Sequence, residues 1–554
     1  MKLCMTHGYM LSGSGSNVYV QNLCRGLVKV GHDVHLLCQE PEPLRYDFVN
    51  AQYAASERGV EALGKQETPY AGYCAVYGPD IGDLLPVYVY DDYPGWRVKT
   101  FLDLDEEELE RYVSGNVAAV QAVLEHSGAD GVVTNHSVPG PEIARIALEG
   151  TGVTYTSVVH GSALQYVARR SERYMKMAGS GLSGATSIVA LSSHSAGTIA
   201  EDFPQLAGRT LAVPGGVDTD LFRPDRLDLS VTNALEGGPG RGPEQTEELH
   251  ATINRSANSV DAGNLARHLA AISASYEPRK HDRDAGKRIR EVLGSGDPIV
   301  IYLGKLIHSK GVHSLLSAFA KMRQETGARL LVIGYGTFRE GLEALVHTLS
   351  TGNRSAVEMF VENGRLFEGG PASPMEHFEV PDELLRDAEG MEEYVEFVGP
   401  LYHEELSRVL PAVDVAVVPS IFPETFGLVA AEFGASGVPP FVADHSGLRE
   451  AGSFVGKGLP FDPRVSLKGS FEENLARALT GYLSLPEDER RKCRETVERN
   501  AVEDLSWGAL AERIAISPSQ SSRRPMIWTW IRPMSSDRAW LTNAIRASAA
   551  TSES

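Results

Sequence analysis

Two series of short apolar segments, each alternating with helical stretches, constrain the fold of this chain more than any other feature. One series fills the first two hundred residues, and the other begins near Pro298. Segments such as 299–303 and 415–419 are apolar and β-branched without a helical period, which is typical of strands buried on both faces. Strands that alternate with helices predict parallel sheets covered by helices. Because 554 residues exceed what one hydrophobic core supports, we predict two doubly wound α/β domains in tandem.

The expected strands and domain limits follow from these segments. The strands are expected at 2–6, 33–38, 131–134, 154–159, 187–191 and 210–213, and then at 299–303, 329–333, 395–398, 415–419 and 440–443. The first domain is expected to span 1–223 and the second 298–490. Between them, 224–297 is a polar linker or insertion with helical character near 265–272, and the second domain holds an acidic insertion at about 350–393.

The composition narrows the range of partners and locations. A formal net charge of −21 argues against nucleic acid, whose phosphate backbone would be repelled. The five cysteines show no zinc spacing, so we expect reduced thiols in the core. No apolar segment approaches the length of a membrane span, and the first residues do not resemble a signal peptide, so we expect a cytoplasmic protein.

The segment 517–554 differs from the rest of the chain. It holds three of the five tryptophans and mostly arginine charge, together with prolines that oppose regular structure. We expect a disordered tail. A basic and aromatic segment that lies on a membrane surface, or an altered reading frame near the end of the gene, would also explain this composition.

The most informative candidate site lies at 414–432. An apolar strand ends near Ser420 and is followed by a turn with Glu424 and Gly427, and then by a helix with Glu432. The free backbone N–H groups in the first turn of such a helix, together with its dipole, favour a bound phosphate. Two carboxylates beside a phosphate site suit sugar and ribose hydroxyls, so the pattern favours a sugar nucleotide.

Other candidates follow other expected strands. Lys305 and Lys310 come directly after 299–303, where two cations suit a diphosphate. His160 ends the strand at 154–159, at the edge where doubly wound folds bind ligands. Gly13 and Gly15 precede the first helix and allow a ligand to approach the backbone. Val18 stands where a dinucleotide fingerprint requires its third glycine, which disfavours nicotinamide binding.

Taken together, these motifs resemble those of glycosyltransferase family 4. The resemblance rests on Glu424 and Glu432 as the family's E-x7-E motif, on the glycine loop with Gly31-His32-Asp33-Val34, on Gly215-Gly216-Val217-Asp218, and on Gly304-Lys305 to Lys310-Gly311. Lys305 stands where the family usually has arginine, which keeps the charge but loses the bidentate geometry.

The resemblance implies a GT-B fold, in which two Rossmann-like domains face each other across an interdomain cleft. The first would be the acceptor side, the second would bind the nucleotide sugar, and a closing helix at 491–516 would return to the first domain. The implied catalytic residues are Glu424, Lys305, Lys310 and His160. The implied donor-binding residues are Gly13, Gly15, Gly427, Leu428, Val429, Glu432, Gly334 and Tyr402, the last two near the nucleotide base.

The implied activity is transfer of a sugar from a nucleoside diphosphate with retention of the anomeric configuration. We expect no metal and no cofactor, since the lysines neutralise the leaving group and the Asp-x-Asp triplets lie in solvated or linker segments. The acceptor, whether carbohydrate, lipid-linked or small molecule, is open, and membrane contact is expected only for a lipid-linked one. Two alternatives are an inactive sugar-nucleotide-binding protein and a nicotinamide-dependent oxidoreductase.

Overall fold

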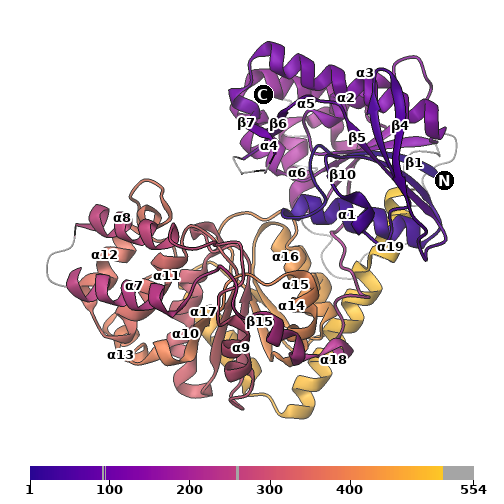
Figure 1. The fold of residues 1–554 in the computed structure, drawn as a ribbon. Helices are drawn as coiled ribbons and strands as arrows, with labels where there is room; N and C mark the ends of the chain where they lie inside the picture. The colour runs from indigo at the N-terminus through magenta and orange to yellow at the C-terminus, as the bar shows by residue number, and fades with distance from the viewer. Residues whose placement is uncertain (90–92, 94, 257–260, 516–554) are drawn as a thin grey trace, which may run out of the picture.

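The computed structural model of the chain describes residues 1–89, 93, 95–256 and 261–515. Figure 1 shows two α/β bodies, the N-terminal domain in indigo to magenta and the C-terminal domain in magenta to orange. The tail predicted at 517–554 lies outside the described residues. Among the described helices, none combines the length and the apolar composition needed to cross a membrane.

The N-terminal domain is built on a nine-stranded sheet with the order β11-β10-β9-β8-β1-β2-β5-β3-β4. All neighbours are parallel except β3 and β4, which form an antiparallel pair at one edge. The strands are β1 (Lys2–Thr6), β2 (Asp33–Leu37), β3 (Ala51–Ser56), β4 (Gly59–Lys65), β5 (Tyr73–Pro79), β8 (Gly131–Asn135), β9 (Tyr155–Val159), β10 (Ser187–Ala190) and β11 (Thr210–Ala212), with β6 (Leu84–Val87) and β7 (Arg97–Thr100) as a separate pair.

Six helices connect these strands. They are α1 (Gly15–Lys29), α2 (Glu106–Ser127), α3 (Gly140–Ala147), α4 (Ser162–Tyr166), α5 (Glu172–Gly184) and α6 (Ser193–Asp202). Helix α2 begins with a capping box between Asp105 and Glu108, which satisfies N–H groups that the helix itself cannot pair. Helix α1 packs its buried apolar face, with Val20, Leu23 and Leu27, into the core.

The C-terminal domain holds a six-stranded parallel sheet with the order β14-β13-β12-β15-β16-β17. The strands are β12 (Ile299–Leu303), β13 (Arg329–Ile333), β14 (Val395–Phe397), β15 (Val415–Val418), β16 (Pro440–Ala443) and β17 (Arg464–Val465). The helices are α10 (Val312–Thr326), α11 (Arg339–Ser350), α12 (Arg354–Glu362), α13 (Asp382–Asp387), α14 (His403–Val409), α15 (Leu428–Ala435), α16 (Ser446–Val455), α17 (Phe471–Leu483) and α18 (Glu487–Leu505).

The segment 224–297 is folded rather than a plain polar linker. It forms α7 (Pro243–Ser256), α8 (Ala262–Ser273) and α9 (Ala285–Leu293). Leu249, Ile253 and Leu265 are buried, because these helices are amphipathic and turn their few apolar residues toward α11. The high share of polar residues led to the prediction of a linker, whereas the segment packs on the outer side of the C-terminal domain (Figure 1).

The chain ends its described part by returning to the first domain, as expected. Helix α18 packs on α15, and α19 (Trp507–Ala515) packs on α1, which Figure 1 shows as a yellow segment crossing between the domains. The rings of Trp507 and Tyr19 lie edge to face at 4.9 Å between centroids. The chain therefore passes between the two domains twice, first after β11 and again at α18 and α19.

The eleven predicted strands all occur, each within one residue of its expected limits. Six strands were missed, because partial exposure or the presence of glycine and proline weakens the pattern of several of them. They are β3, β4, β5, β6, β7 and β17. In each sheet, the chain first adds strands on one side of a central strand and later adds strands on its other side. This strand is β1 in the first sheet and β12 in the second. Ligands of doubly wound folds bind at the carboxyl ends of strands at such points.

Candidate functional site

The two domains touch where these carboxyl ends meet. The Thr425 hydroxyl donates to the carbonyl oxygen of His160 at 3.2 Å. Gly161 has a φ of +81°, and a Cβ atom there would lie 3.0 Å from Oγ1 of Thr425, so this approach requires glycine. The hydroxyl of Ser195 donates to the carbonyl oxygen of Thr425 at 3.3 Å. The loop after β15 therefore rests against the ends of β9 and β10.

A second contact between the domains lies at the start of α6. The backbone N–H groups of Ser193 and His194 donate to the carboxylate of Glu450 on α16 at 2.8 and 3.1 Å. A carboxylate at a helix N-terminus is stabilised by the free N–H groups and by the helix dipole. Glu450 thus holds α16 of one domain against α6 of the other.

On the C-terminal side, the structure brings Lys310 and Glu424 together as an ion pair. The hydroxyl of Ser420 donates to Oε1 of the same carboxylate at 2.8 Å, and the backbone N–H of Glu424 donates to Oγ of Ser446 at 2.9 Å. Side chains of Lys310 and Glu424 are 29% and 24% exposed, so both are held in place yet remain accessible to a ligand.

Lys305 lies on the loop that follows β12, and its side chain is exposed. Its carbonyl oxygen accepts a hydrogen bond from the Tyr302 hydroxyl at 2.9 Å, and this bond attaches the loop to the end of β12. In the part of the chain that the structure describes, the Lys305 ammonium makes no ion pair. The loop therefore presents one paired lysine and one lysine that faces solvent.

The start of α15 is the place where the sequence predicts a phosphate site. Gly427 precedes the helix, and Leu428 and Val429 form its first turn, whose N–H groups have no acceptor within the helix. Gly215 of the N-terminal domain lies directly against this turn, since a Cβ atom there would be 2.4 Å from Cδ2 of Leu428. The start of α15 thus faces the first domain.

Gly334 lies at the end of β13, next to the loop that carries Lys305. It has a φ of +150°, and a Cβ atom there would be 1.9 Å from the carbonyl oxygen of Gly304. Only glycine allows the turns after β12 and β13 to lie this close together. The role of Gly334 in this structure is to bring two loops of the site into contact.

Glu432 lies within α15 and has different neighbours from Glu424. Its side chain is 11% exposed, and its carboxylate lies 3.5 Å from Nε2 of His403 at the start of α14. Burial raises the pKa of Glu432, and His403 opposes this effect. Tyr402, which precedes His403 in the chain, is half exposed, and its ring contacts that of His281. The carboxylates of Glu424 and Glu432 thus belong to two separate groups of contacts.

On the N-terminal side, His160 is buried and has one defined hydrogen bond. The Asn135 side-chain amide donates to the carbonyl oxygen of Thr6 at 3.0 Å, so its oxygen faces Nε2 of His160 at 2.8 Å. His160 therefore carries its proton on Nε2, and the lone pair is on Nδ1. Burial, and to a lesser degree His7, lowers the pKa of His160 to about 3, so the ring is neutral at pH 7.

Two further buried histidines surround this ring. His136 lies beside His160, with 4.8 Å between ring centroids, and stacks on His7 at 5.7 Å. Burial is the main cause that lowers the pKa of His136 and lowers that of His7 to about 4. Neither ring nitrogen of His136 has a hydrogen-bond partner among the described residues. Both nitrogens are buried within the cluster.

Gly13 and Gly15 flank Ser14, the N-cap residue of α1, and each has open space where a Cβ atom would project. Asn17, one turn into the helix, donates to the carbonyl oxygen of Ser12 at 2.6 Å, and its amide oxygen lies 3.0 Å from Nε2 of His7. The glycine loop is thus connected to the histidine cluster through one buried side chain.

The predicted residues separate into three groups. Lys310 and Glu424 are in contact, His160 meets the same loop through Thr425, and Glu432 lies with His403 on another side of α15. The sequence analysis missed the residues that connect them: Asn135, His136, His7, Ser420, Thr425, His403 and Glu450. Asn135 and His136 stand at the carboxyl end of β8, so the rule that selected His160 would have found them.

Comparisons with known proteins agree with the division into two α/β domains. A family model described as "Glycosyltransferase Family 4" matches residues 13–221. A second, described as "Glycosyl transferases group 1", matches residues 286–368 and 380–499. The first match covers the N-terminal sheet except β1, the second covers the C-terminal sheet, and helices α7 and α8 lie between the two matches.

Characterised relatives match parts of the chain. Glycogen synthase of Mycobacterium tuberculosis is 27% identical over 237 residues, which are 42% of this chain and 45% of that synthase. D-inositol 3-phosphate glycosyltransferase of Corynebacterium glutamicum is 35% identical over 149 residues, which are 26% of this chain and 33% of that enzyme. The chain thus aligns with less than half the length of these relatives.

Solved structures match nearly the whole chain. Sucrose-phosphate synthase from Thermosynechococcus elongatus superposes with a TM-score of 0.53 at 17% identity, over 93% of this chain and 97% of that one. The catalytic domain of starch synthase IV from Arabidopsis thaliana, bound to ADP and acarbose, has a TM-score of 0.51 at 15% identity, over 93% and 98%. At such identities the likeness concerns the fold.

Proposed function

Because the chain belongs to glycosyltransferase family 4 and has its GT-B fold, we propose that it transfers a sugar from a nucleoside diphosphate to a hydroxyl of the acceptor. The observation that carries this proposal is the contact of three elements at one place. These are the Lys310 and Glu424 pair, the start of α15, and the buried His160 across the domain boundary.

In this proposal the diphosphate binds at the start of α15, through the N–H groups of Gly427, Leu428 and Val429. Lys310 and the exposed Lys305 provide the positive charge. As the bond between the anomeric carbon and the phosphate oxygen breaks, negative charge grows on the diphosphate, and the two ammonium groups stabilise it. No metal ion is needed for this task, which is why we propose a metal-independent reaction.

Glu424 and Glu432 have different proposed roles, as their separate contacts suggest. Glu424, held by Ser420 and Lys310, would accept hydrogen bonds from the transferred sugar. Glu432 lies deeper, where burial raises its pKa, and would accept from the ribose hydroxyls. Gly334 and Tyr402 would lie near the nucleotide base, at the ends of β13 and β14.

His160 would bind a hydroxyl of the transferred sugar through the lone pair on Nδ1. With a pKa of about 3 it does not accept a proton at neutral pH, so it positions the sugar and takes no part in proton transfer. We propose that the acceptor hydroxyl attacks from the face that the diphosphate leaves, and that a phosphate oxygen receives its proton. The new bond then has the anomeric configuration of the old one.

The first test is calorimetry with UDP-, GDP- and ADP-sugars. We expect micromolar affinity for one nucleotide class, and a loss of at least tenfold in Glu432→Ala, whose buried carboxylate we assign to the ribose. Glu495→Ala removes an exposed glutamate on α18 and serves as the matched control. No binding of any of these compounds by the folded protein would contradict the proposed donor site.

Turnover of the bound donor separates an enzyme from an inactive binding protein. We expect release of the nucleoside diphosphate in the presence of a suitable acceptor, undiminished by a metal chelator. The anomeric configuration of the product, followed by NMR, tests retention. Binding without transfer to any acceptor or to water would favour the inactive alternative, and inversion would contradict the proposed mechanism.

A further inference from the structure

A second cluster of functional side chains lies on the outer side of the C-terminal domain. His250 belongs to α7, His347 to α11, and Glu392 to the short helix Met391–Tyr394 just before β14. Helices α7 and α11 lie at the end of the domain that carries the inserted helices (Figure 1). Glu392 precedes β14, whereas the proposed donor site lies at the carboxyl ends of the parallel strands β12 and β15, so the cluster is separate from that site.

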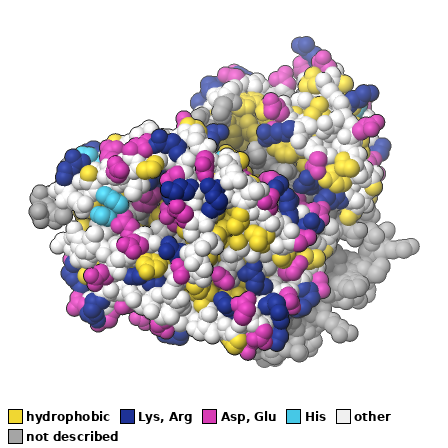
Figure 2. All heavy atoms as spheres, turned by 60° about the horizontal axis from the view of Figure 1, so that its bottom comes forward, with side chains coloured by type: hydrophobic (Ala, Val, Ile, Leu, Met, Phe, Trp, Pro, Cys, Tyr) yellow, Lys and Arg dark blue, Asp and Glu magenta, His cyan; other side chains and the backbone are white. Residues whose placement is uncertain are grey.

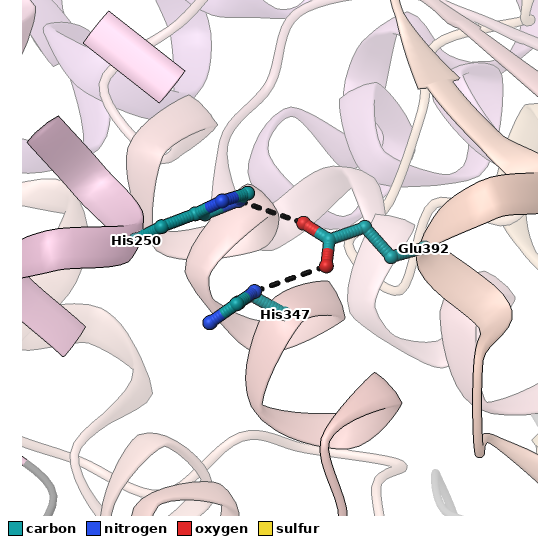
Figure 3. Close-up of side chains that lie close together, drawn as sticks. All are labelled: His250, His347 and Glu392. Atoms are coloured by element: carbon teal, nitrogen blue, oxygen red, sulfur yellow. Dashed lines mark hydrogen bonds and ion pairs between the residues drawn. The ribbon is translucent and has the colours of Figure 1, made fainter. Parts of the chain in front are cut away.

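The three side chains converge on one point. Figure 3 shows both histidine rings facing the carboxylate of Glu392. Nε2 of His250 lies 2.7 Å from Oε1, and Nδ1 of His347 lies 3.0 Å from Oε2. Their nitrogen and oxygen atoms all lie within 4.8 Å of one another. In the part of the chain that the structure describes, this is the one group of at least three such side chains with that spacing.

Each ring nitrogen of His347 faces a side-chain oxygen. Its Nδ1 faces the Glu392 carboxylate, and its Nε2 faces the side-chain oxygen of Asn254 at 3.3 Å. Both neighbours are acceptors, while a neutral imidazole has one N–H to donate. If Nε2–H is donated to Asn254, the lone pair of Nδ1 points at a carboxylate. A cation between the two would convert this repulsion into binding.

The stacking of the His250 and His347 rings favours one metal cation shared by both rings over protonation of each ring. His250 and His347 are stacked, with 4.1 Å between centroids and 14° between planes. Two imidazolium ions at this distance would repel each other beside a single carboxylate. Two neutral rings and one carboxylate form instead the ligand set of a transition-metal dication. Asn254 accepts from the other ring nitrogen of His347 and so orients the ring, as hydrogen-bond partners of metal-binding histidines commonly do.

We propose that His250, His347 and Glu392 bind a first-row transition-metal dication, with Zn²⁺ as the ion that suits this ligand set best. Two ligand atoms at about 2.1 Å from a tetrahedral ion are about 3.4 Å apart. The observed spacings require only small side-chain movements to reach this geometry. His347 is 9% exposed, whereas His250 and Glu392 are 31% and 33% exposed, so one side stays open to a fourth ligand such as water.

The ion would act as a structural clamp. It would connect the inserted helix α7 to α11 and to the segment before β14. This proposal does not depend on the proposed transfer reaction. Helix α7 otherwise contacts α11 through the apolar residues Leu249 and Ile253. A metal at this place would hold the insertion against the domain and leave the chemistry of the donor site unchanged.

The test uses the full chain, freed of metal with a chelator, and titrated with Zn²⁺ and separately with Co²⁺. We expect one equivalent of Zn²⁺ per chain, a higher melting temperature with Zn²⁺, and the visible absorption of tetrahedral Co²⁺. His250→Ala and Glu392→Gln should each weaken binding at least tenfold, and Glu392→Gln keeps the size of the side chain.

His268→Ala is the matched control, because it removes an exposed histidine of the neighbouring helix α8 whose ring bonds only to its own helix. It should bind Zn²⁺ like the unaltered chain. Absence of a stoichiometric equivalent, equal affinity in His250→Ala and the unaltered chain, or a Co²⁺ spectrum that Glu392→Gln leaves unchanged would overturn the proposal. A hydrogen-bonded cluster held together by protons would give the first of these results.

Discussion

The two sides of the interdomain site differ in charge. On the C-terminal side, the ammonium groups of Lys305 and Lys310 and the carboxylate of Glu424 lie on exposed or partly exposed side chains. On the N-terminal side, His160 and His136 are buried, and burial lowers the pKa of each so far that both are neutral at pH 7. The difference fits the two tasks that we propose: charged groups would stabilise the leaving diphosphate, and neutral donors and acceptors would orient hydroxyl groups.

The face of the molecule that Figure 2 shows has no such separation. Basic and acidic side chains are interspersed over it, with hydrophobic side chains between them. Mixed surface charge of this kind is common on globular proteins.

The largest effect is expected when the charged side loses its paired cation. Lys310→Met should lower kcat about 100- to 1,000-fold, the usual consequence of removing one group that stabilises charge in a transition state. Steady-state kinetics measures this change. Lys321→Met, which removes a lysine paired with Glu473 on the surface of α10, is the matched control and should have little effect. Equal rates in the two variants would contradict the assigned role.

Acid should destabilise the neutral side. The pKa of His160 lies below its usual value, so the unfolded chain binds a proton that the folded chain does not, and stability falls as the pH falls below about 6.5. At pH 5 this amounts to about 2 kcal/mol for one such histidine. In His160→Gln the loss of stability between pH 7 and pH 5, measured by denaturant unfolding, should be smaller by that amount. An unchanged loss would mean that His160 is charged in the folded protein.

The same substitution should affect turnover less than the loss of Lys310 does. Removal of one hydrogen bond to the transferred sugar corresponds to about a tenfold lower kcat/KM, while the profile of rate against pH keeps its shape because His160 transfers no proton. Kinetics of His160→Gln across pH 6 to 8 tests both statements. A pH profile that loses one of its limbs in the variant would assign proton transfer to His160 and contradict the comparison.

The smallest effect is expected at the contact between Glu450 and α6. Glu450→Ala removes a carboxylate from a helix N-terminus, an interaction of about 0.3 to 1 kcal/mol. We expect KM for the donor to rise about two- to fivefold, with kcat nearly unchanged, and Glu450→Gln to retain part of the contact. A loss of activity as large as that of Lys310→Met would place Glu450 in the site itself.

The sequence indicated the charged side better than the neutral side. Lys310 and Glu424 follow two strands with clear apolar patterns, and parallel strands bring their carboxyl ends to one edge. The contact of His160 with Thr425 could not be read in this way, because Thr425 belongs to the other domain. Asn135 ends the strand next to that of His160, and the same rule would have found it. The predicted strand at 131–134 also ended one residue before Asn135.

The inserted helices show a similar limit. Their polar composition suggested a linker, because a short amphipathic helix needs few apolar residues to pack on one face. The joining of His250, His347 and Glu392 depends on the packing of α7 on α11, which no local motif encodes. Spacing rules for metal ligands find sites whose ligands lie within one loop or helix. The ligands of this proposed site come from three separate elements.

The most direct test of the division between charged and neutral sides is calorimetry of the free nucleoside diphosphate and of its sugar derivative. Their two dissociation constants are compared for the unaltered chain, Lys310→Met and His160→Gln. We predict that Lys310→Met weakens both ligands by a similar factor. We predict that His160→Gln leaves the affinity for the diphosphate unchanged and weakens only the sugar derivative. If His160→Gln weakens the diphosphate as much as Lys310→Met does, the two sides do not have separate tasks.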